Sequence, residues 1–222
     1  KKDYKHQEVD GWWGGNDYND DIMWITIATV RSYLATGDTK YLETAKINFD
    51  NTYARSWSDD LGGGLFWRVD NQTKNACVNG PGAIAACLLG EALDDESYFE
   101  KAREILKWER DVLFDPETGH IGDNIGLDGG RNNDASTYNQ GTFIGASCLL
   151  YDHYGDDMYL NDAILAADYT MIDMYHYGVM NNEDSGGDLP GFKGIFTRWV
   201  NDLIVNHNQT QYIDWMQYNA WT

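Results

Sequence analysis

The chain has 222 residues, which is long enough for one domain with a substantial hydrophobic core. It carries 36 Asp and Glu against 16 Lys and Arg, and the resulting formal charge of -20 argues against binding to nucleic acid or to anionic lipid. The balance favours a neutral or cationic partner, and the sequence has no run of 18 apolar residues that would predict a membrane span.

Three asparagines 60 residues apart, Asn19, Asn79 and Asn139, open the same succession of elements. Each polar start leads into an almost wholly apolar helix, predicted at residues 22–35, 83–93 and 142–151. A turn and an amphipathic helix follow, the latter predicted at residues 41–53, 98–113 and 159–174. Repetition at this period indicates stacked helical hairpins, none of which can bury its apolar face alone.

The turn between the two helices of each hairpin contains an aspartate three residues before an aromatic residue. These aspartates are Asp38, Asp95 and Asp156. Since Asp is a preferred residue at a helix N-cap, we expect each of them to cap the amphipathic helix that follows.

The two kinds of helix predict an all-α fold, a closed α/α barrel or toroid. A helix that is apolar all round is surrounded by protein, and an amphipathic helix has one wet face, so the first kind forms an inner ring and the second an outer ring. A flat solenoid is the alternative. Residues 194–199 and 211–221 predict a fourth, partial hairpin. Six hairpins need on the order of 360 residues, so we expect 1–222 to be a single catalytic domain that is incomplete at both ends.

Parallel inner helices bring their N-termini to one end of the ring, where unpaired backbone N–H groups gather. The long connections at residues 57–79, 114–138 and 181–192 return to the same end. They are rich in Gly and aromatic residues, and residues 65–67 in the first are compatible with a short strand. Loops on a rigid scaffold commonly carry binding residues, so we expect the functional site at this end.

One of the four Asp-Asp pairs, Asp20-Asp21, begins an inner helix. Capping uses one carboxylate at most, so the second is surplus to structure. Two carboxyl groups about 5 to 5.5 Å apart are what a retaining glycosidase needs, and like charges this close raise one pKa. The pair is therefore our candidate catalytic site.

Aromatic residues make up 14% of the chain, and several lie in the expected loops, including Trp13, Trp67 and Tyr138. Flat aromatic faces beside Asn, Gln and Asp suit a carbohydrate, which has apolar C–H faces and many hydroxyl groups. Packing of loops onto the barrel is the alternative for each of them. The three cysteines, Cys77, Cys87 and Cys148, are expected to be unpaired.

Five segments, in order along the chain, resemble glycoside hydrolase family 76, the endo-α-1,6-mannanases and their fungal cell-wall relatives. They are NDDIMW at residues 19–24, GGGLFW at 62–67, KN with NGP at 74–81, TYNQGTFIG at 137–145 and FKGIF at 192–196. Bacterial relatives carry further Trp residues after the Asp pair, where this chain has Met23-Trp24-Ile25-Thr26.

The resemblance implies an (α/α)6 barrel and retaining hydrolysis of α-1,6-linked mannose in yeast-type mannan. It makes Asp20 the nucleophile and Asp21 the general acid/base, with no metal and no cofactor. The residues expected to bind substrate are Trp13, Asn19, Trp67, Asn79, Tyr138, Asn139, Gln140 and Lys193. Helix capping is the alternative for the Asn and Gln residues, and Lys74 and Lys193 are also candidates for lowering the pKa of a neighbouring carboxyl group.

The expected partner is an α-mannan polysaccharide or oligosaccharide, bound by a monomer at an extracellular, periplasmic or cell-surface location. Two other classes stay open: another (α/α)6 enzyme, such as a transglycosylase or an epimerase, and a noncatalytic glycan-binding protein. An epimerase would be expected to use histidines at the site, and His120 alone falls in a loop expected there.

Overall fold

The computed structural model describes residues 11–183 and 186–221. The eight α-helices of this part are α1 (Asn19–Thr36), α2 (Thr39–Ser56), α3 (Ala76–Leu93), α4 (Glu96–Val112), α5 (Thr137–Tyr154), α6 (Asp157–Asp173), α7 (Phe192–Asn206) and α8 (Ile213–Trp221). The strands are β1 (Thr73–Asn75), β2 (Asn124–Gly126), β3 (Arg131–Asn132), β4 (Tyr175–His176) and β5 (Val179–Met180). Short 3₁₀ turns stand at η2 (Asp60–Gly62), η3 (Leu189–Gly191) and η4 (Thr210–Tyr212).

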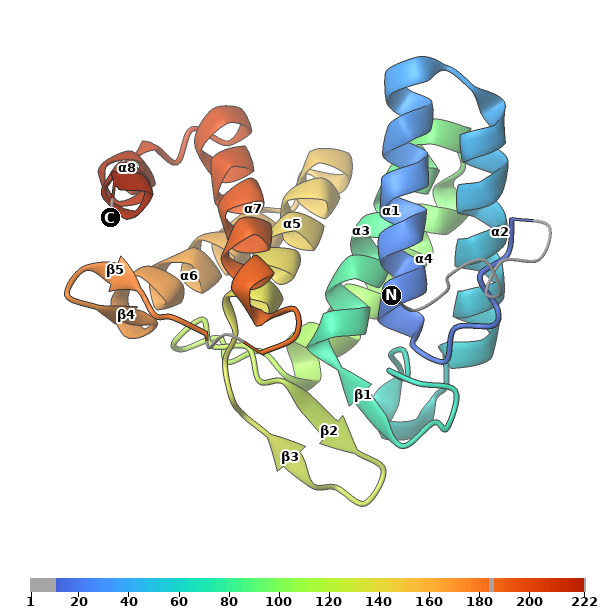
Figure 1. The fold of residues 1–222 in the computed structure, drawn as a ribbon, viewed down its shortest axis with the longest axis horizontal. Coiled ribbons are helices and arrows are strands. Elements are labelled where there is room, and N and C mark those ends of the chain that lie inside the picture. The colour runs from blue at the N-terminus through green and yellow to red at the C-terminus, as the bar shows by residue number, and fades with distance from the viewer. Residues whose placement is uncertain (1–10, 184–185, 222) are drawn as a thin grey trace.

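Consecutive helices form three hairpins, α1 with α2, α3 with α4, and α5 with α6. The inner helices α1, α3, α5 and α7 pack side by side in that order, and α2 and α6 lie at the periphery (Figure 1). Helix α8 follows α7 as predicted and packs on η4, which in turn packs on α7. The alternation of inner and outer helices confirms the predicted all-α toroid.

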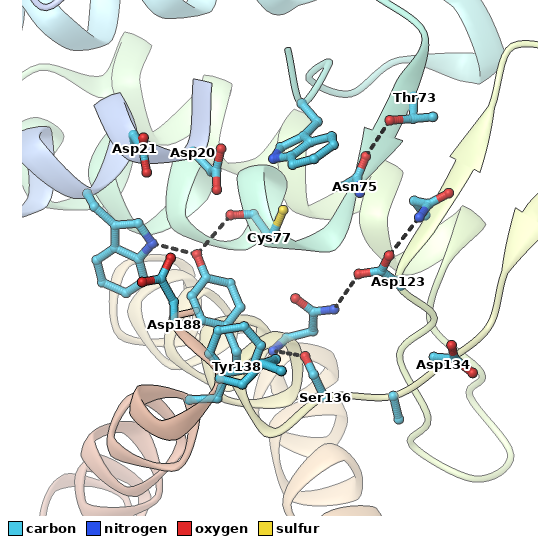
Figure 2. Close-up of a pocket in the computed structure, with 17 residues that line it drawn as sticks. Asp20, Asp21, Thr73, Asn75, Cys77, Asp123, Asp134, Ser136, Tyr138 and Asp188 are labelled. Atoms are coloured by element: carbon cyan, nitrogen blue, oxygen red, sulfur yellow. Dashed lines mark hydrogen bonds between the residues drawn. The ribbon is translucent and has the colours of Figure 1, made fainter. Parts of the chain in front are cut away.

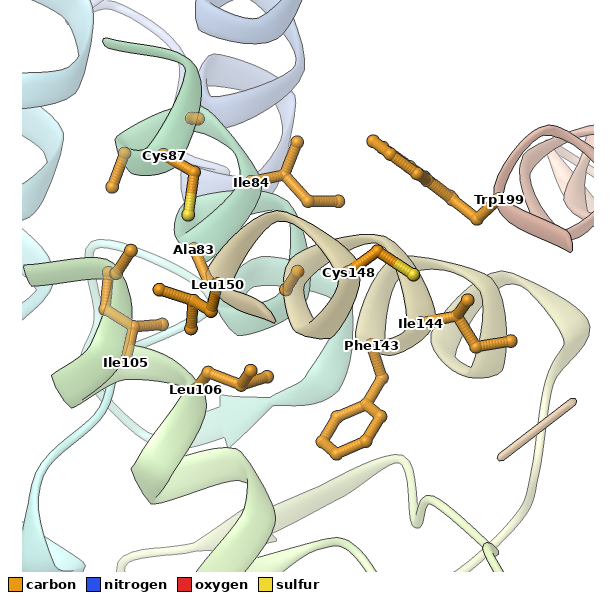
Figure 3. Close-up of a cluster of buried hydrophobic side chains, with 14 of the residues drawn as sticks. Ala83, Ile84, Cys87, Ile105, Leu106, Phe143, Ile144, Cys148, Leu150 and Trp199 are labelled. Atoms are coloured by element: carbon orange, nitrogen blue, oxygen red, sulfur yellow. The ribbon is translucent and has the colours of Figure 1, made fainter. Parts of the chain in front are cut away.

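Helix α3 lies at the centre of the core. Every residue from Val78 to Gly90 is buried, and Ile84 of this helix belongs to the same core cluster as Ile144 of α5 and Trp199 of α7 (Figure 3). Within the described residues α3 alone has the length and hydropathy of a membrane span, but 78% of it is buried inside the protein. Its apolar composition is therefore that of a core helix.

Three outer helices begin at the predicted aspartate caps. The side chain of Asp38 accepts a hydrogen bond from the backbone N–H of Lys40, and Asp95 and Asp156 make the equivalent bond two residues ahead. All three cysteines are free thiols, as expected, and Cys87 and Cys148 are buried in inner helices.

The start of α3 differs from the prediction, which placed it at residue 83. The helix begins at Ala76 and runs through Pro81. Proline cannot donate a backbone hydrogen bond, so the carbonyl of Cys77, four residues earlier, loses its partner within the helix. Instead it accepts a hydrogen bond of 3.0 Å from the Tyr138 hydroxyl. A contact from another helix thus compensates for the proline.

The long connections pair with one another beside the inner helix starts. Strands β1, β2 and β3 form an antiparallel sheet in that order. Leu65 and Phe66 form only isolated bridges, with Trp57 and Lys74, so the short strand suggested at residues 65–67 is absent from the described structure. One loop of this small sheet precedes α3 and the other follows α4. Their pairing holds both loops at the same end of the barrel.

Candidate active site

The N-terminal ends of the inner helices meet at an open pocket of about 630 Å³ (Figure 2). Its acidic lining residues are Asp20, Asp21, Asp123, Asp134 and Asp188. Its aromatic lining residues are Trp24, Trp67, Tyr138 and Phe192. None of the lining residues in the described part of the chain is Lys or Arg. The pocket is therefore acidic and aromatic, and it lies at the end of the barrel that the repeat predicts.

Asp20 lies in the first turn of α1 and is mostly withdrawn from water. Burial, and after it the neighbouring charge of Asp21, raise the pKa of its carboxyl group to about 7, although hydrogen bonds from the helix backbone and from Trp67 oppose the shift. Its Oδ1 atom is buried and has no hydrogen-bond partner in the described structure. A carboxyl group in this state can hold a proton near neutral pH.

Asp21 differs from its neighbour because it is exposed. Its Oδ2 atom accepts a hydrogen bond of 2.8 Å from the side chain of Asn16. Arg55 of α2 donates to the Asn16 carbonyl at 2.9 Å and so holds the loop that carries this contact. The two adjacent carboxyl groups thus have unlike environments, which is how enzymes give two acids separate roles.

Tyr138 links three inner helices at the pocket. Its hydroxyl donates to the Cys77 carbonyl of α3 and accepts a hydrogen bond from the Trp24 indole of α1. Its pKa is raised well above the ordinary value, first by burial and then by nearby acidic groups. The two hydrogen bonds therefore fix the position of the ring at the pocket, and the hydroxyl is a neutral donor.

Asn139, next along α5, lines the pocket and has one side-chain atom without a hydrogen-bond partner in the described structure. Its Nδ2 atom lies 3.4 Å from Asp123, whereas its Oδ1 atom is buried without a partner. Such an acceptor is satisfied by a ligand hydroxyl or by water.

Three residues predicted to bind substrate, Asn19, Asn79 and Gln140, are fully buried and do not line the pocket. Their side chains bond to other parts of the protein. The Asn19 side chain donates to the Phe66 carbonyl and accepts from Arg55, so it holds two loops in place.

Asn79 and Gln140 act in the same way on the two long connections. The Asn79 amide bonds to both the N–H and the carbonyl of Leu65, and the Gln140 amide bonds to Ile121 and Gly119. The structure therefore corrects the prediction that these side chains face sugar. Asn79 and Gln140 lie below the ends of their helices because α3 and α5 each begin three residues earlier, at Ala76 and Thr137.

The two lysines also differ from expectation. Lys74 is buried and donates to the backbone carbonyls of Ser58, Asp60 and Gly63, and burial lowers its pKa to about 8. Lys193 donates to the Met180 carbonyl at 3.2 Å. Neither lines the pocket, and nor does Trp13, whose backbone N–H bonds to Asn48.

Several pocket residues were not predicted from sequence. Trp24 is one turn after Asp20 on α1, so helical spacing alone points it to the same side. Asp123 and Asp188 come from loops and carry no such periodic signal. Phe192, by contrast, ends a connection that was expected at this end of the barrel, and its ring lies 5.0 Å from that of Tyr138.

The fold and the acidic pocket together define a protein of the α/α-toroid class with a site at the inner helix starts. The sequence profile of glycosyl hydrolase family 76 matches residues 2–221, and the chain belongs to this family.

Known proteins of the same family resemble the chain in sequence and structure. The GH76A alpha-1,6-mannanase from Salegentibacter sp. HEL1_6 is 40% identical with a TM-score of 0.88, over 93% of this chain and 64% of that one. An inactive variant of the same enzyme, with two consecutive aspartates changed to asparagine, was solved in complex with alpha-1,6-mannotriose; it is 38% identical with the same TM-score and the same coverage.

Among curated proteins, the mannan endo-1,6-alpha-mannosidase DFG5 of Candida albicans is 31% identical over 166 residues. The match covers 66% of this chain and 36% of that protein. The chain thus spans about a third of the curated relative and less than two thirds of the solved enzyme.

Proposed function

We propose that the chain is the catalytic domain of a glycoside hydrolase that cleaves α-1,6-mannosidic bonds within yeast-type mannan, with retention of anomeric configuration. The observation that carries the proposal is the Asp20 carboxyl, withdrawn from water beside Asp21 at the wall of an open pocket. Three other Asp-Asp pairs exist, but none of them lines this pocket. The variant of the related mannanase in which two consecutive aspartates are changed to asparagine is inactive, which supports the same pair here.

In the proposed reaction Asp20 attacks the anomeric carbon while Asp21 protonates the leaving oxygen. Asp21 then removes a proton from the water that hydrolyses the glycosyl intermediate. Trp24, Trp67 and Phe192 supply flat apolar surfaces for the sugar rings, and Asn139 supplies an acceptor for a hydroxyl group. No residue of this scheme needs a metal or cofactor.

The proton has to move for these roles to hold. In the free protein the raised pKa keeps the shared proton on Asp20, whereas a nucleophile must be ionised. The two carboxyl groups interact, because the charge of Asp21 contributes to the raised pKa of Asp20. Positive charge that develops at the anomeric carbon stabilises an ionised Asp20, so the bound substrate shifts the proton to Asp21.

The first test is release of oligosaccharides from unbranched α-1,6-mannan. Asp20→Asn and Asp21→Asn are each expected to lower the rate by 10³-fold or more, on the order of the loss of a principal catalytic group, while circular dichroism stays unchanged. Asp59→Asn and Asp60→Asn, in an exposed loop, are the matched controls and retain activity. Normal turnover by both site variants would refute the assignment. Sizing of the products separates hydrolysis from transglycosylation, because only the latter makes longer chains.

Azide separates the two roles. With an activated aryl α-mannoside, azide attacks the vacant face of Asp20→Ala directly and gives an inverted glycosyl azide. In Asp21→Ala it replaces water in the second step and gives a retained one. The opposite pattern of products would show that Asp21 is the nucleophile and Asp20 the acid/base.

The proposed setting follows from the substrate. A polysaccharide of the cell wall is met outside the cytoplasm, so we place the protein at an extracellular, periplasmic or cell-surface location. The site is built from one chain, which is consistent with a monomer.

A further inference from the structure

A second cluster of chemically reactive side chains lies away from the pocket. Cys148 of α5, Asp202 of α7 and His207 after the end of α7 each offer one donor atom, and these atoms all lie within 4.8 Å of one another. Cys148 is ten residues further along α5 than Tyr138, which is about 15 Å of helix. The cluster is therefore separate from the catalytic pocket.

The histidine of the cluster is buried and one of its ring nitrogens lacks a partner. The His207 side chain is 2% exposed, and its Nε2 atom has no hydrogen bond in the described structure although it lies 3.5 Å from Oδ2 of Asp202. The other oxygen of Asp202 accepts a hydrogen bond from Asn206 at 2.7 Å, which leaves Oδ2 available. A buried polar atom without a partner is rare and calls for an explanation.

The opposite side of the same imidazole faces a further carboxylate. Nδ1 of His207 lies 3.8 Å from Oδ1 of Asp152. Asp152 is four residues after Cys148 on α5, so both are on one face of that helix. A histidine that binds a metal through one nitrogen commonly donates its other N–H to a carboxylate, which fixes the ring orientation.

We propose that Cys148, Asp202 and His207 bind a divalent transition-metal ion of the Zn²⁺ type. The ligands are the Cys148 thiolate, Oδ2 of Asp202 and Nε2 of His207, with water in the fourth position and Asp152 orienting the imidazole. Sulfur and imidazole ligands select zinc-like ions, whereas Mg²⁺ and Ca²⁺ prefer oxygen ligands. Binding displaces the thiol proton of Cys148 to solvent.

The ion joins two inner helices at the end of the barrel opposite the pocket. Cys148 of α5 and Trp199 of α7 belong to one core cluster, so the ion would bind where these two helices already pack together (Figure 3). Its role is to stabilise the association of α5 with α7, and it takes no part in sugar cleavage.

The test uses Co²⁺ as a spectroscopic substitute on the metal-free 222-residue chain. We expect one equivalent of Co²⁺ to produce a thiolate-to-cobalt charge-transfer band that Zn²⁺ abolishes by displacement. At Zn²⁺ concentrations well above the dissociation constant, the melting temperature should rise by about 5 °C or more. Cys148→Ser removes the band and the thermal shift. The matched control Cys87→Ser, a buried cysteine of α3 outside the cluster, keeps both.

Two milder variants keep the proposal testable even if Cys148→Ser folds poorly. Asp202→Asn weakens Co²⁺ binding at a partly exposed position, and Asp152→Asn weakens it about tenfold while the band remains, because Asp152 acts through His207. Absence of both the band and the thermal shift in the unsubstituted chain would overturn the proposal. An unchanged band in folded Cys148→Ser would do the same.

Discussion

The Asp20 carboxyl group opposes folding at neutral pH. Its pKa is about 7 in the folded protein against 3.8 for an unperturbed aspartate, mainly because burial disfavours the charge. Between these two values the folded state binds more protons than the unfolded state, so stability falls as the pH rises through this window. One pKa unit corresponds to about 1.4 kcal/mol, which sets an upper limit of about 4 kcal/mol.

We therefore expect Asp20→Asn, which never ionises, to be more stable than the unsubstituted chain at about pH 8 and nearly equal to it at about pH 4. Urea unfolding at both pH values measures the difference. Asp21→Asn is the control: it removes the neighbouring charge but not the burial, so part of the pH dependence should persist. If the free energy of unfolding of the unsubstituted chain and of Asp20→Asn changed equally with pH, Asp20 would be solvated and its pKa would not be raised.

Asn79 is a residue for which structure and sequence predict different phenotypes. Its side chain bonds to both backbone groups of Leu65 and to the Asn75 carbonyl. Asn79→Ala leaves these buried groups unpaired, and we expect a loss of about 2–3 kcal/mol in the free energy of unfolding. Asn51→Ala, on the exposed face of α2, should change it by less than about 0.5 kcal/mol. A raised KM at unchanged stability would instead favour the sugar contact predicted from sequence.

At the scale of elements, α5 and α7 cross at backbone contact. A Cβ atom on Gly141 would lie 2.6 Å from the Cα atom of Phe196, and one on Gly145 would lie 2.3 Å from the Trp199 ring. Only glycine permits this approach. The crossing sets the position of the start of α7, and so of Phe192 at the pocket.

Gly141→Ala is accordingly expected to lower the free energy of unfolding by about 2 kcal/mol or more, because α7 has to move away. Gly194 of α7 provides the matched control, since a Cβ atom there meets nothing within 4 Å. Gly194→Ala should raise stability by about 0.5–1 kcal/mol through the usual helix preference for alanine. Chemical denaturation measures both, and a harmless Gly141→Ala would contradict the close crossing.

Prediction from sequence succeeded where the signal was local. The caps at Asp38, Asp95 and Asp156 and the alternation of apolar and amphipathic helices depend on neighbours a few residues away. The start of α3 was missed because Pro81 signals a helix end, and its compensation comes from Tyr138, 57 residues later. The loop residues Asp123 and Asp188 were also missed. Their place at the pocket depends on contacts between distant segments, which no local pattern encodes.

At the scale of the whole molecule, the formal charge of -20 is concentrated in part at the pocket. Five aspartates line it, and no cationic side chain of the described chain does so. Asp20 carries a proton near neutral pH, but the remaining carboxyl groups keep the field negative. The field admits neutral sugars and disfavours anionic ones.

We expect an α-1,6-mannooligosaccharide that bears a phosphate to have a several-fold higher KM than its neutral counterpart at low salt. The difference should shrink in about 1 M salt, where the screening length is about 3 Å. Asp188→Asn, at the exposed edge of the pocket, should reduce the discrimination, while Asp128→Asn, in a turn outside the pocket, should leave it unchanged. Equal KM values for the two substrates at low salt would show that the field does not reach the bound sugar.

The proline within α3 also ties two distant positions together in evolution. Any other residue at position 81 would bring a backbone N–H that competes with the Tyr138 hydroxyl for the Cys77 carbonyl. That competition would weaken the fixed position of the hydroxyl to which Trp24 donates. We therefore expect positions 81 and 138 to covary among homologues, so that the loss of proline accompanies the loss of the tyrosine hydroxyl.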